Sequence, residues 1–127
     1  MNPLTREWIE KAEGDIITAE RELRARRLPN YDAACFHAQQ TAEKYLKAYL
    51  QERGAAIPFT HNLIDLAILC APFDPSFSTL DAELKSLNGY AVRFRYPGEV
   101  STKVEANEAV KAANKVRCFA RKKLELA

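Results

Sequence analysis

The chain has 127 residues, of which 47% are hydrophobic and 28% are charged, and its formal net charge is +2. These values predict a single domain, residues 1–127, with a core of its own. The net charge is too small to indicate a nucleic-acid-binding protein by itself. The chain opens on a charged amphipathic segment and holds no apolar run of membrane-spanning length, so we expect neither a signal peptide nor a membrane anchor.

The cysteines are three in number and lie far apart, at Cys35, Cys70 and Cys118. Each falls inside an apolar helical pattern, so we expect reduced, buried thiols in a cytoplasmic protein. A Cys-x-x-Cys pair is absent, which gives zinc binding no support. We therefore expect neither a metal nor a cofactor.

The first predicted helix runs from about Arg6 to Arg27, with Thr5 as its cap. Its apolar face would consist of Trp8, Ala12, Ile16, Ala19 and Leu23. A second helix is predicted from about Tyr31 to Arg53, capped by Asn30 and stopped by Gly54.

This second helix carries a wide apolar stripe, which is typical of the central helix of a compact bundle. The stripe comprises Tyr31, Ala34, Cys35, Ala38, Ala42, Tyr45, Leu46, Tyr49 and Leu50. The opposite, polar side comprises Gln40, Glu43, Lys44 and Lys47, among which Phe36 is an unexpected aromatic. An exposed Phe36 would be explained if that side met a second copy of the chain.

Three further helices are predicted after Pro58. They span about His61 to Cys70 with Thr60 as cap, about Ser78 to Phe94, and the segment that begins at Thr102 with a capping-box pattern. The last helix would bury Ala106, Ala109, Val110, Ala113, Val116, Ala120 and Leu124. With no convincing strand, the pattern predicts an all-α protein, an up-and-down bundle of four or five helices.

Three sequence pieces together resemble the HEPN family of small prokaryotic helical proteins. They are Ala-Gln-Gln-x-Ala-Glu-Lys-x-Leu-Lys-Ala within residues 38–48, Pro-Phe-Thr-His-Asn-Leu at 58–63, and Tyr-Ala-Val-Arg-Phe-Arg-Tyr-Pro at 90–97. The resemblance covers about Trp8 to Leu124. It implies a HEPN-like bundle and a partner encoded nearby, a minimal nucleotidyltransferase, in a toxin–antitoxin or nucleotide-handling pair.

Active members of the wider HEPN superfamily are ribonucleases with an arginine followed, after four to six residues, by a histidine. In such chemistry the imidazole moves the proton of the ribose hydroxyl and the arginine stabilises charge on the phosphate. This chain has only His37 and His61, and no histidine follows Arg93 or Arg95. We therefore assign no catalytic residue and expect no ribonuclease activity.

The Arg93–Tyr96 segment is the best candidate site. Arg93, Arg95 and Tyr96 would bind an anion, such as a nucleotide phosphate or an acidic partner, because guanidinium groups match phosphate oxygens bidentately. The alternative is that the two arginines only compensate the negative end of their helix. His61 either bonds locally or lines a polar pocket with this segment, and Lys44 and Lys47 complete the candidate set.

Asp15 projects onto the apolar face of the first helix, where a carboxylate needs a partner. Arg95 is the preferred partner, with Lys44 and tyrosine hydroxyls as alternatives. His37, on the flank of the second helix, is expected to be a half-exposed surface imidazole. Two basic clusters, Arg21 to Arg27 and Arg117 to Lys123, are interpreted as cations at the negative ends of two helices.

Three functions remain open on the sequence alone. The first is a non-catalytic, homodimeric HEPN interaction module that pairs with a minimal nucleotidyltransferase. The second is a metal-independent ribonuclease that uses Arg93, Arg95 and His61 in an unorthodox arrangement. The third is a regulator in which the same arginines hold a nucleotide or RNA phosphate without cleavage. No membrane partner is expected.

Overall fold

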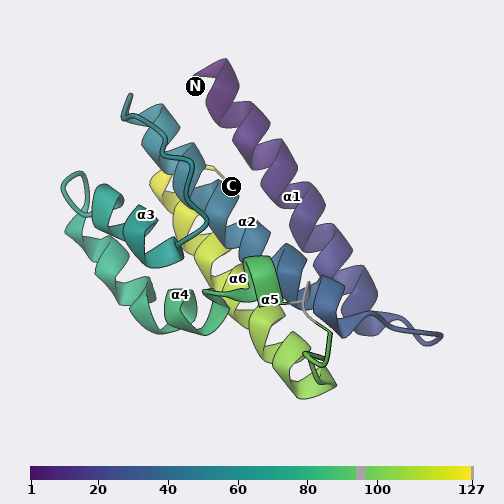
Figure 1. The fold of residues 1–127 in the computed structure, drawn as a ribbon. Coiled ribbons are helices and arrows are strands. Elements are labelled where there is room, and N and C mark those ends of the chain that lie inside the picture. The colour runs from purple at the N-terminus through teal and green to yellow at the C-terminus, as the bar shows by residue number, and fades with distance from the viewer. Residues whose placement is uncertain (94–96, 127) are drawn as a thin grey trace.

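The computed structural model describes residues 1–93 and 97–126, and for residues 92 and 93 the backbone alone. Two long helices, α1 (Pro3–Arg24) and α2 (Tyr31–Glu52), form an antiparallel pair, and the last helix, α6 (Lys103–Lys123), packs against both (Figure 1). A shorter layer on the other side of α2 consists of α3 (Leu63–Cys70), the 3-10 turn η1 (Pro75–Leu80), α4 (Asp81–Leu87) and α5 (Tyr90–Arg93). Strands do not occur in the described ranges, so the predicted all-α bundle is confirmed.

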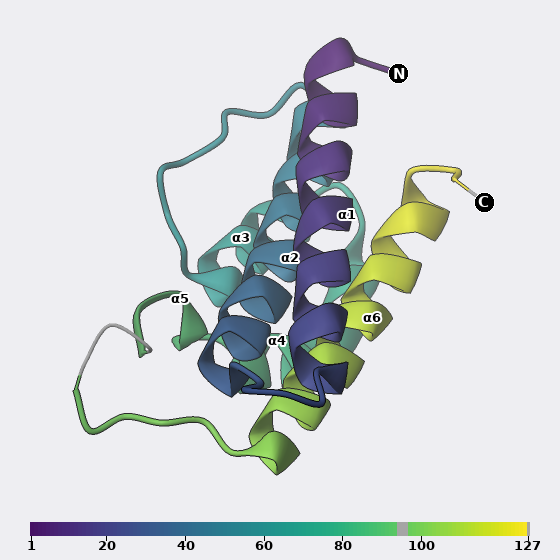
Figure 2. The same ribbon diagram turned by 90° about the vertical axis from the view of Figure 1, so that its right-hand side faces the viewer.

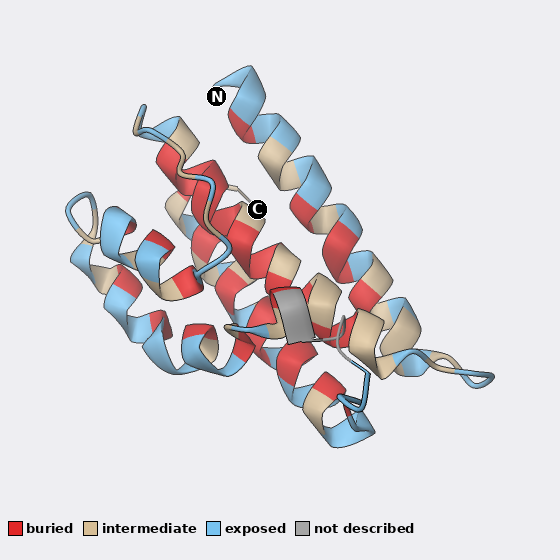
Figure 3. Ribbon diagram, viewed as in Figure 1, coloured by how far each residue is buried: buried red, intermediate tan, exposed pale blue. Residues whose placement is uncertain are grey.

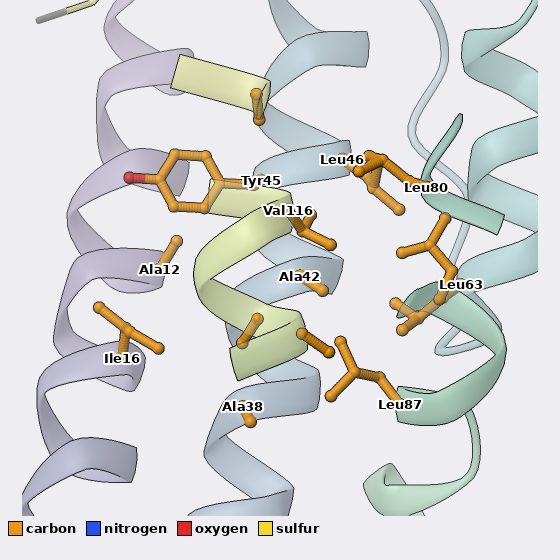
Figure 4. Packing of buried hydrophobic residues seen from close by; sticks show 14 of the residues in the cluster. Ala12, Ile16, Ala38, Ala42, Tyr45, Leu46, Leu63, Leu80, Leu87 and Val116 are labelled. Carbon is orange, nitrogen blue, oxygen red and sulfur yellow. The ribbon is translucent and has the colours of Figure 1, made fainter. Parts of the chain in front are cut away.

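The predicted central position of the second helix is also confirmed. Figure 3 shows α2 buried along most of its length, whereas α1 and α6 each keep an exposed outer face. The core joins Ala12 and Ile16 of α1 to Tyr45 and Leu46 of α2 and to Val116 of α6 (Figure 4). All seven predicted core positions of the last helix are buried.

Side-chain caps account for most helix starts, and two predicted caps are wrong. Asn2, not Thr5, caps α1, because Pro3 occupies the first turn and the Asn2 side chain accepts from the Leu4 N–H. Asn62, not Thr60, caps α3 by accepting from the Ile64 and Asp65 N–H groups. The caps predicted for α2, Asn30, and for α6, the Thr102–Glu105 capping box, are both present.

The predicted single helix from Ser78 to Phe94 is wrong. The chain forms η1, α4 and α5 instead, and it breaks after Leu87 because Asn88 is extended and Gly89 has φ +102°. An L side chain rarely adopts such a φ, so the glycine permits a turn that the apolar periodicity of this stretch did not reveal. As a result, α5 lies against α2 as a separate element.

Two of the three cysteines are buried as predicted, namely Cys35 and Cys70. The prediction for Cys118 is wrong, because this residue is exposed. It lies two positions from both Val116 and Ala120, which are buried, and two positions turn a helix by about 200°. Cys118 therefore lies on the outer side of α6.

Candidate functional site

A polar strip runs along α2 between α1 and the segment that links α2 to α3. It consists of His37, Gln40, Lys44 and Lys47, whose spacing of three and four residues places them on one side of the helix. Figure 2 shows this side of α2, with α1 on one flank and the arching 53–62 segment on the other. Two carboxylates, Asp15 from α1 and Glu43 from α2 itself, organise the strip.

Asp15 is buried and binds two groups of α2. Its Oδ1 lies 2.7 Å from His37 Nδ1, and its Oδ2 accepts a hydrogen bond from Lys44 Nζ at 2.5 Å. The prediction that this carboxylate needs a partner is confirmed, and the partner is the alternative, Lys44. The preferred partner, Arg95, lies outside the described residues.

The prediction for His37 as a plain surface imidazole is wrong in one respect. Its side chain is 29% exposed, as expected, but its ring is held by Asp15. The sequence contained a signal for this contact, because Asp15 lies on the inward face of α1 and His37 and Lys44 are two helical turns apart on α2. The sequence did not show that these two helix faces pack against each other.

Glu43 and Lys47 are buried, so the predicted placement of both on an exposed polar side of α2 is wrong. Glu43 Oε1 accepts from Gln39 Nε2 at 3.3 Å and from Gln40 Nε2 at 3.3 Å, and it lies 3.0 Å from His61 Nδ1. Glu43 Oε2 accepts from Lys47 Nζ at 3.1 Å. The physical reason is that the 53–62 segment folds across this side of α2. A helical projection includes only the residues of one helix, so it cannot show that another segment covers them.

Both carboxylates therefore use the same arrangement, with an imidazole on one oxygen and an ammonium group on the other. An ionised carboxylate can only accept hydrogen bonds, so the Nδ1 atom of each histidine carries the hydrogen. Nε2 is then the ring nitrogen that remains for other contacts, as an acceptor in the neutral ring and as a donor after protonation. The strip and the neighbouring loop thus present two oriented imidazoles, His37 and His61.

His61 lies in the loop before α3, not in the first helical turn, and its side chain is 67% exposed. Beside it is a hollow of about 290 Å³ lined by His61, Asn62, Asn88, Gly89 and Ala91. Asn88 holds the end of the loop before α3 in position. Its side chain accepts a hydrogen bond from the Leu63 N–H and donates one to the Asn62 side chain. The hollow thus lies next to the start of α5.

The other predicted residues of this site cannot be placed in the hollow. Arg95 and Tyr96 lie outside the described residues, and for Arg93 the backbone alone is described, as the last residue of α5. The pocket predicted between His61 and the Arg93–Tyr96 segment is therefore supported only on the His61 side. The roles of the two arginines stay predictions.

A second charged cluster joins α1, α2 and α6, and sequence reasoning missed it. Arg117 binds Glu13 bidentately, with N···O distances of 2.6 and 2.7 Å. The Tyr45 hydroxyl donates to Glu13 and accepts from Arg121 Nη1 at 3.2 Å. The predicted role of Arg117 and Arg121 as cations at a helix end is thus incomplete, since both face a carboxylate of α1.

The pKa values in this cluster shift in the directions that these contacts require. The bidentate hydrogen bonds from Arg117, the largest cause, lower the pKa of Glu13, and they raise that of Arg117. Burial, aided by the Glu13 carboxylate, raises the pKa of Tyr45 to about 12. With an ionised acid, a protonated phenol and paired cations, the cluster is a structural clamp between helices.

The described residues show neither a metal site nor a membrane span. The described histidines, cysteines and acids form no group of three or more that could hold a metal ion. Among the helices that the structure describes, none combines the length and apolar character that a membrane crossing requires.

Comparison with known proteins gives a consistent result. The sequence model of the HEPN domain matches residues 5–123. The crystal structure of TT1696 from Thermus thermophilus is similar at a TM-score of 0.77 and 31% identity, covering 94% of this chain and 97% of that one. ST0689, an archaeal HEPN homologue, is similar at a TM-score of 0.74 and 24% identity, covering 94% and 96%. A search of curated proteins found no match.

Proposed function

Because the chain belongs to the HEPN domain family, as the match over residues 5–123 shows, we propose that it is a non-catalytic interaction module in the cytoplasm of a prokaryote. Its partner in this proposal is a minimal nucleotidyltransferase, in a toxin–antitoxin or nucleotide-handling pair. Cys35, Cys70 and Cys118 form no disulfide in the described part of the chain, which suits a reducing compartment.

The observation that carries the proposal is the position of Phe59. Its side chain is fully exposed, at 106% relative accessibility, on the 53–62 segment beside the polar strip. It lies two residues before His61, whose ring is anchored by buried Glu43. An aromatic anchor next to oriented polar groups is the usual composition of a protein-binding hot spot.

The lysines of the strip favour recognition over cleavage. Ribonuclease chemistry without a metal needs a cation directed at the phosphate as well as an imidazole. Lys44 and Lys47 instead bind Asp15 and Glu43, the acids that hold the two histidines. These ion pairs hold the side chains of the strip in place. They also direct both ammonium groups at carboxylates and not at a phosphate.

Copurification tests the partner. The chain would be coexpressed with a neighbouring open reading frame that carries the Gly-Ser and paired-aspartate signature of a minimal nucleotidyltransferase. We expect a complex that Phe59→Ala weakens at least tenfold and that Phe73→Ala, another partly exposed phenylalanine, leaves within twofold. Equal binding of wild type and Phe59→Ala would refute this surface.

Ribonuclease activity is the competing function. We expect purified protein to leave structured and unstructured RNA intact in the presence of a chelator. Cleavage that disappears in both His37→Ala and His61→Ala would show that the oriented imidazoles are catalytic and that the non-catalytic assignment is wrong.

A second copy of the chain is a further proposed partner, with an interface at or beside the Arg93–Tyr96 segment. Phe36 gives this interface less support than a fully exposed aromatic would, because it is only half-exposed and its ring contacts His37 edge to face at 5.2 Å. Tyr90 is likewise half-buried and near Glu105. Apolar side chains of α3, Ile68 and Leu69, remain exposed and support self-association.

A further inference from the structure

We propose that His37 is a phosphorylation site, whose Nε2 atom accepts the phosphoryl group of a small acyl phosphate. The ring belongs to the polar strip, and the buried carboxylate of Asp15 lies 2.7 Å from its Nδ1 atom. An imidazole backed by a carboxylate is an activated nucleophile. This inference goes beyond the partner surface at Phe59 and does not depend on it.

The two ring nitrogens of His37 have different surroundings. Nδ1 carries the ring hydrogen and donates it to Asp15, whose side chain is only 10% exposed. Nε2 has no hydrogen-bond partner among the residues that the structure describes. The imidazole is 29% exposed, and since Nδ1 faces a buried acid, a small molecule would approach the edge that carries Nε2. In the neutral ring this atom holds an unshared electron pair.

The carboxylate behind the ring is held in place by a second contact. Asp15 projects from α1, and its other oxygen, Oδ2, accepts a hydrogen bond from Lys44 Nζ at 2.5 Å. Oδ1 is thereby directed at the imidazole, and Phe36 contacts the ring edge to face at 5.2 Å. The acid fixes the tautomer of the ring and stabilises the positive charge that the ring gains when Nε2 forms a bond. Asp15 is therefore a positioning residue.

The transfer balances with this imidazole and one co-reactant. The electron pair of Nε2 attacks the phosphorus atom of the acyl phosphate, and a P–N bond forms. The P–O bond to the acyl group breaks, and its electron pair leaves with the carboxylate product. Nε2 carries no hydrogen in the neutral ring, so no proton has to be removed, and the hydrogen on Nδ1 stays directed at Asp15. The ring becomes a cation beside that carboxylate.

The donor must contain an activated phosphoryl group. The P–N bond of phosphohistidine has a high free energy of hydrolysis, so an ordinary phosphate ester cannot drive its formation, whereas the mixed anhydride of an acyl phosphate can. A small donor also suits a half-buried ring on the flank of a helix. The product adds about two negative charges to this side of α2, which changes the charge of the polar strip.

His61 has a similar arrangement but is the weaker candidate. Its Nδ1 lies 3.0 Å from Glu43 Oε1, and that oxygen also accepts from two glutamine amides, each at 3.3 Å. Within the described residues, Asp15 Oδ1 contacts His37 alone, so its charge is not shared with amide donors. His61 is also 67% exposed, and water would reach a phosphoryl group there more easily. His61 therefore serves as the matched control.

Incubation of the purified full chain with acetyl phosphate at mildly alkaline pH tests the site by intact-mass spectrometry. We expect the wild type to gain one phosphoryl group that acid removes and base does not, which is the behaviour of a P–N bond. His37→Gln should lower the extent of modification by roughly tenfold or more, whereas His61→Gln should leave it within about twofold. Inorganic phosphate, which lacks an activated bond, should transfer nothing.

The role of Asp15 has a readout of its own. Phosphorus NMR distinguishes the two ring nitrogens, and in the wild type the phosphoryl group should lie on Nε2 alone. Asp15→Ala frees Nδ1, so we expect a slower reaction and a mixture of both isomers. If Asp15 only supported the fold, its removal would leave the modified nitrogen unchanged.

Three results would overturn the proposal. They are no acid-labile phosphoryl group on the wild type, full modification of His37→Gln, and an equal loss in His61→Gln, which would show that the reaction does not select His37. Circular dichroism of each variant excludes unfolding as the cause of a loss. Phe59→Ala should be phosphorylated like the wild type, so this site and the partner surface can fail separately.

Discussion

Tyr45 shows how one side chain can connect three helices. Its ring is fully buried in α2, while its hydroxyl group meets Glu13 of α1 and Arg121 of α6. A buried phenol with both a donor and an acceptor contact satisfies the hydrogen-bonding capacity that burial would otherwise leave unmet. The same contacts make the fold sensitive to alkaline pH.

We expect the free energy of unfolding to decrease between pH 10 and about 12. The folded pKa of Tyr45, raised to about 12, lies above its ordinary value of 10. The contribution of the protonated hydroxyl is therefore complete below pH 10 and is lost as the pH rises through the folded pKa. Urea unfolding at pH 8, 10 and 11 measures this decrease. Tyr45→Phe should be less stable at pH 8 and show a flatter alkaline decrease; an equally steep one would contradict the assignment.

Leu46 tests the core. It is completely buried on α2, so Leu46→Ala should reduce the free energy of unfolding by roughly 2–5 kcal/mol, the range for emptying a packed aliphatic site. The control is Ile17→Ala on the exposed side of α1, where Ile17 is 54% exposed and we expect a much smaller loss. Chemical denaturation measures both, and an unchanged midpoint for Leu46→Ala would show that α2 is packed in another phase.

At the scale of elements, the break between α4 and α5 decides how the start of α5 meets α2. Asn88 and Gly89 end α4, and Asn88 also holds the start of α3 through the Leu63 N–H. The break therefore fixes the α5 backbone next to the hollow at His61. A continuous helix would have carried Tyr90 and Ala91 in another direction.

A glycine substitution at the break and one inside a regular helix should change the free energy of unfolding in opposite directions. Gly89→Ala should destabilise the fold by about 1–3 kcal/mol, because φ +102° is strained for alanine. Gly14→Ala in the exposed middle of α1 should stabilise it by about 0.5–1 kcal/mol, since a helical glycine loses more backbone entropy and, apart from its chain neighbours and the adjacent helix backbone, no atom lies within 4 Å of the added methyl group. Thermal melts compare them. Stabilisation by Gly89→Ala would mean that α4 and α5 are continuous.

At the scale of the whole molecule, the chain offers surfaces at separate places. Phe59 lies on the 53–62 segment beside the polar strip of α2, Ile68 and Leu69 lie on α3, and a hollow lined in part by Arg24, Arg26 and Lys103 lies at the α1–α2 turn. The residue proposed to bind a partner, Phe59, and the apolar side chains proposed for self-association, Ile68 and Leu69, therefore belong to different segments of the chain.

Self-association is the prediction that belongs to this scale. Light scattering at micromolar concentration should report about twice the chain mass of 14.4 kDa, as for a two-fold dimer. Arg93→Ala and Arg95→Ala should weaken the dimer or its binding of an anionic ligand. The role proposed for the Arg93–Tyr96 segment would be contradicted if the protein is a monomer and neither substitution changes its stability or its binding.

The sequence by itself determined the three long helices, the central place of α2 and the family, because these depend on patterns within one helix or on residue order. Thus Asn30, the Thr102–Glu105 capping box and the alanine-rich face of α6 were all predictable. It also placed Asp15 on an inward face and required a partner for it.

Only the tertiary structure decided which partners meet. His37 and Lys44 reach Asp15 because α1 lies antiparallel on α2, and Glu43 and Lys47 are buried because the 53–62 segment crosses their side of the helix. Gly89 breaks a pattern that reads as one helix, since its φ depends on the packing that it permits. The periodicity of a helix shows which of its residues face inward and which face outward. The energy of a buried charge depends instead on its partner groups, and these come from other parts of the chain.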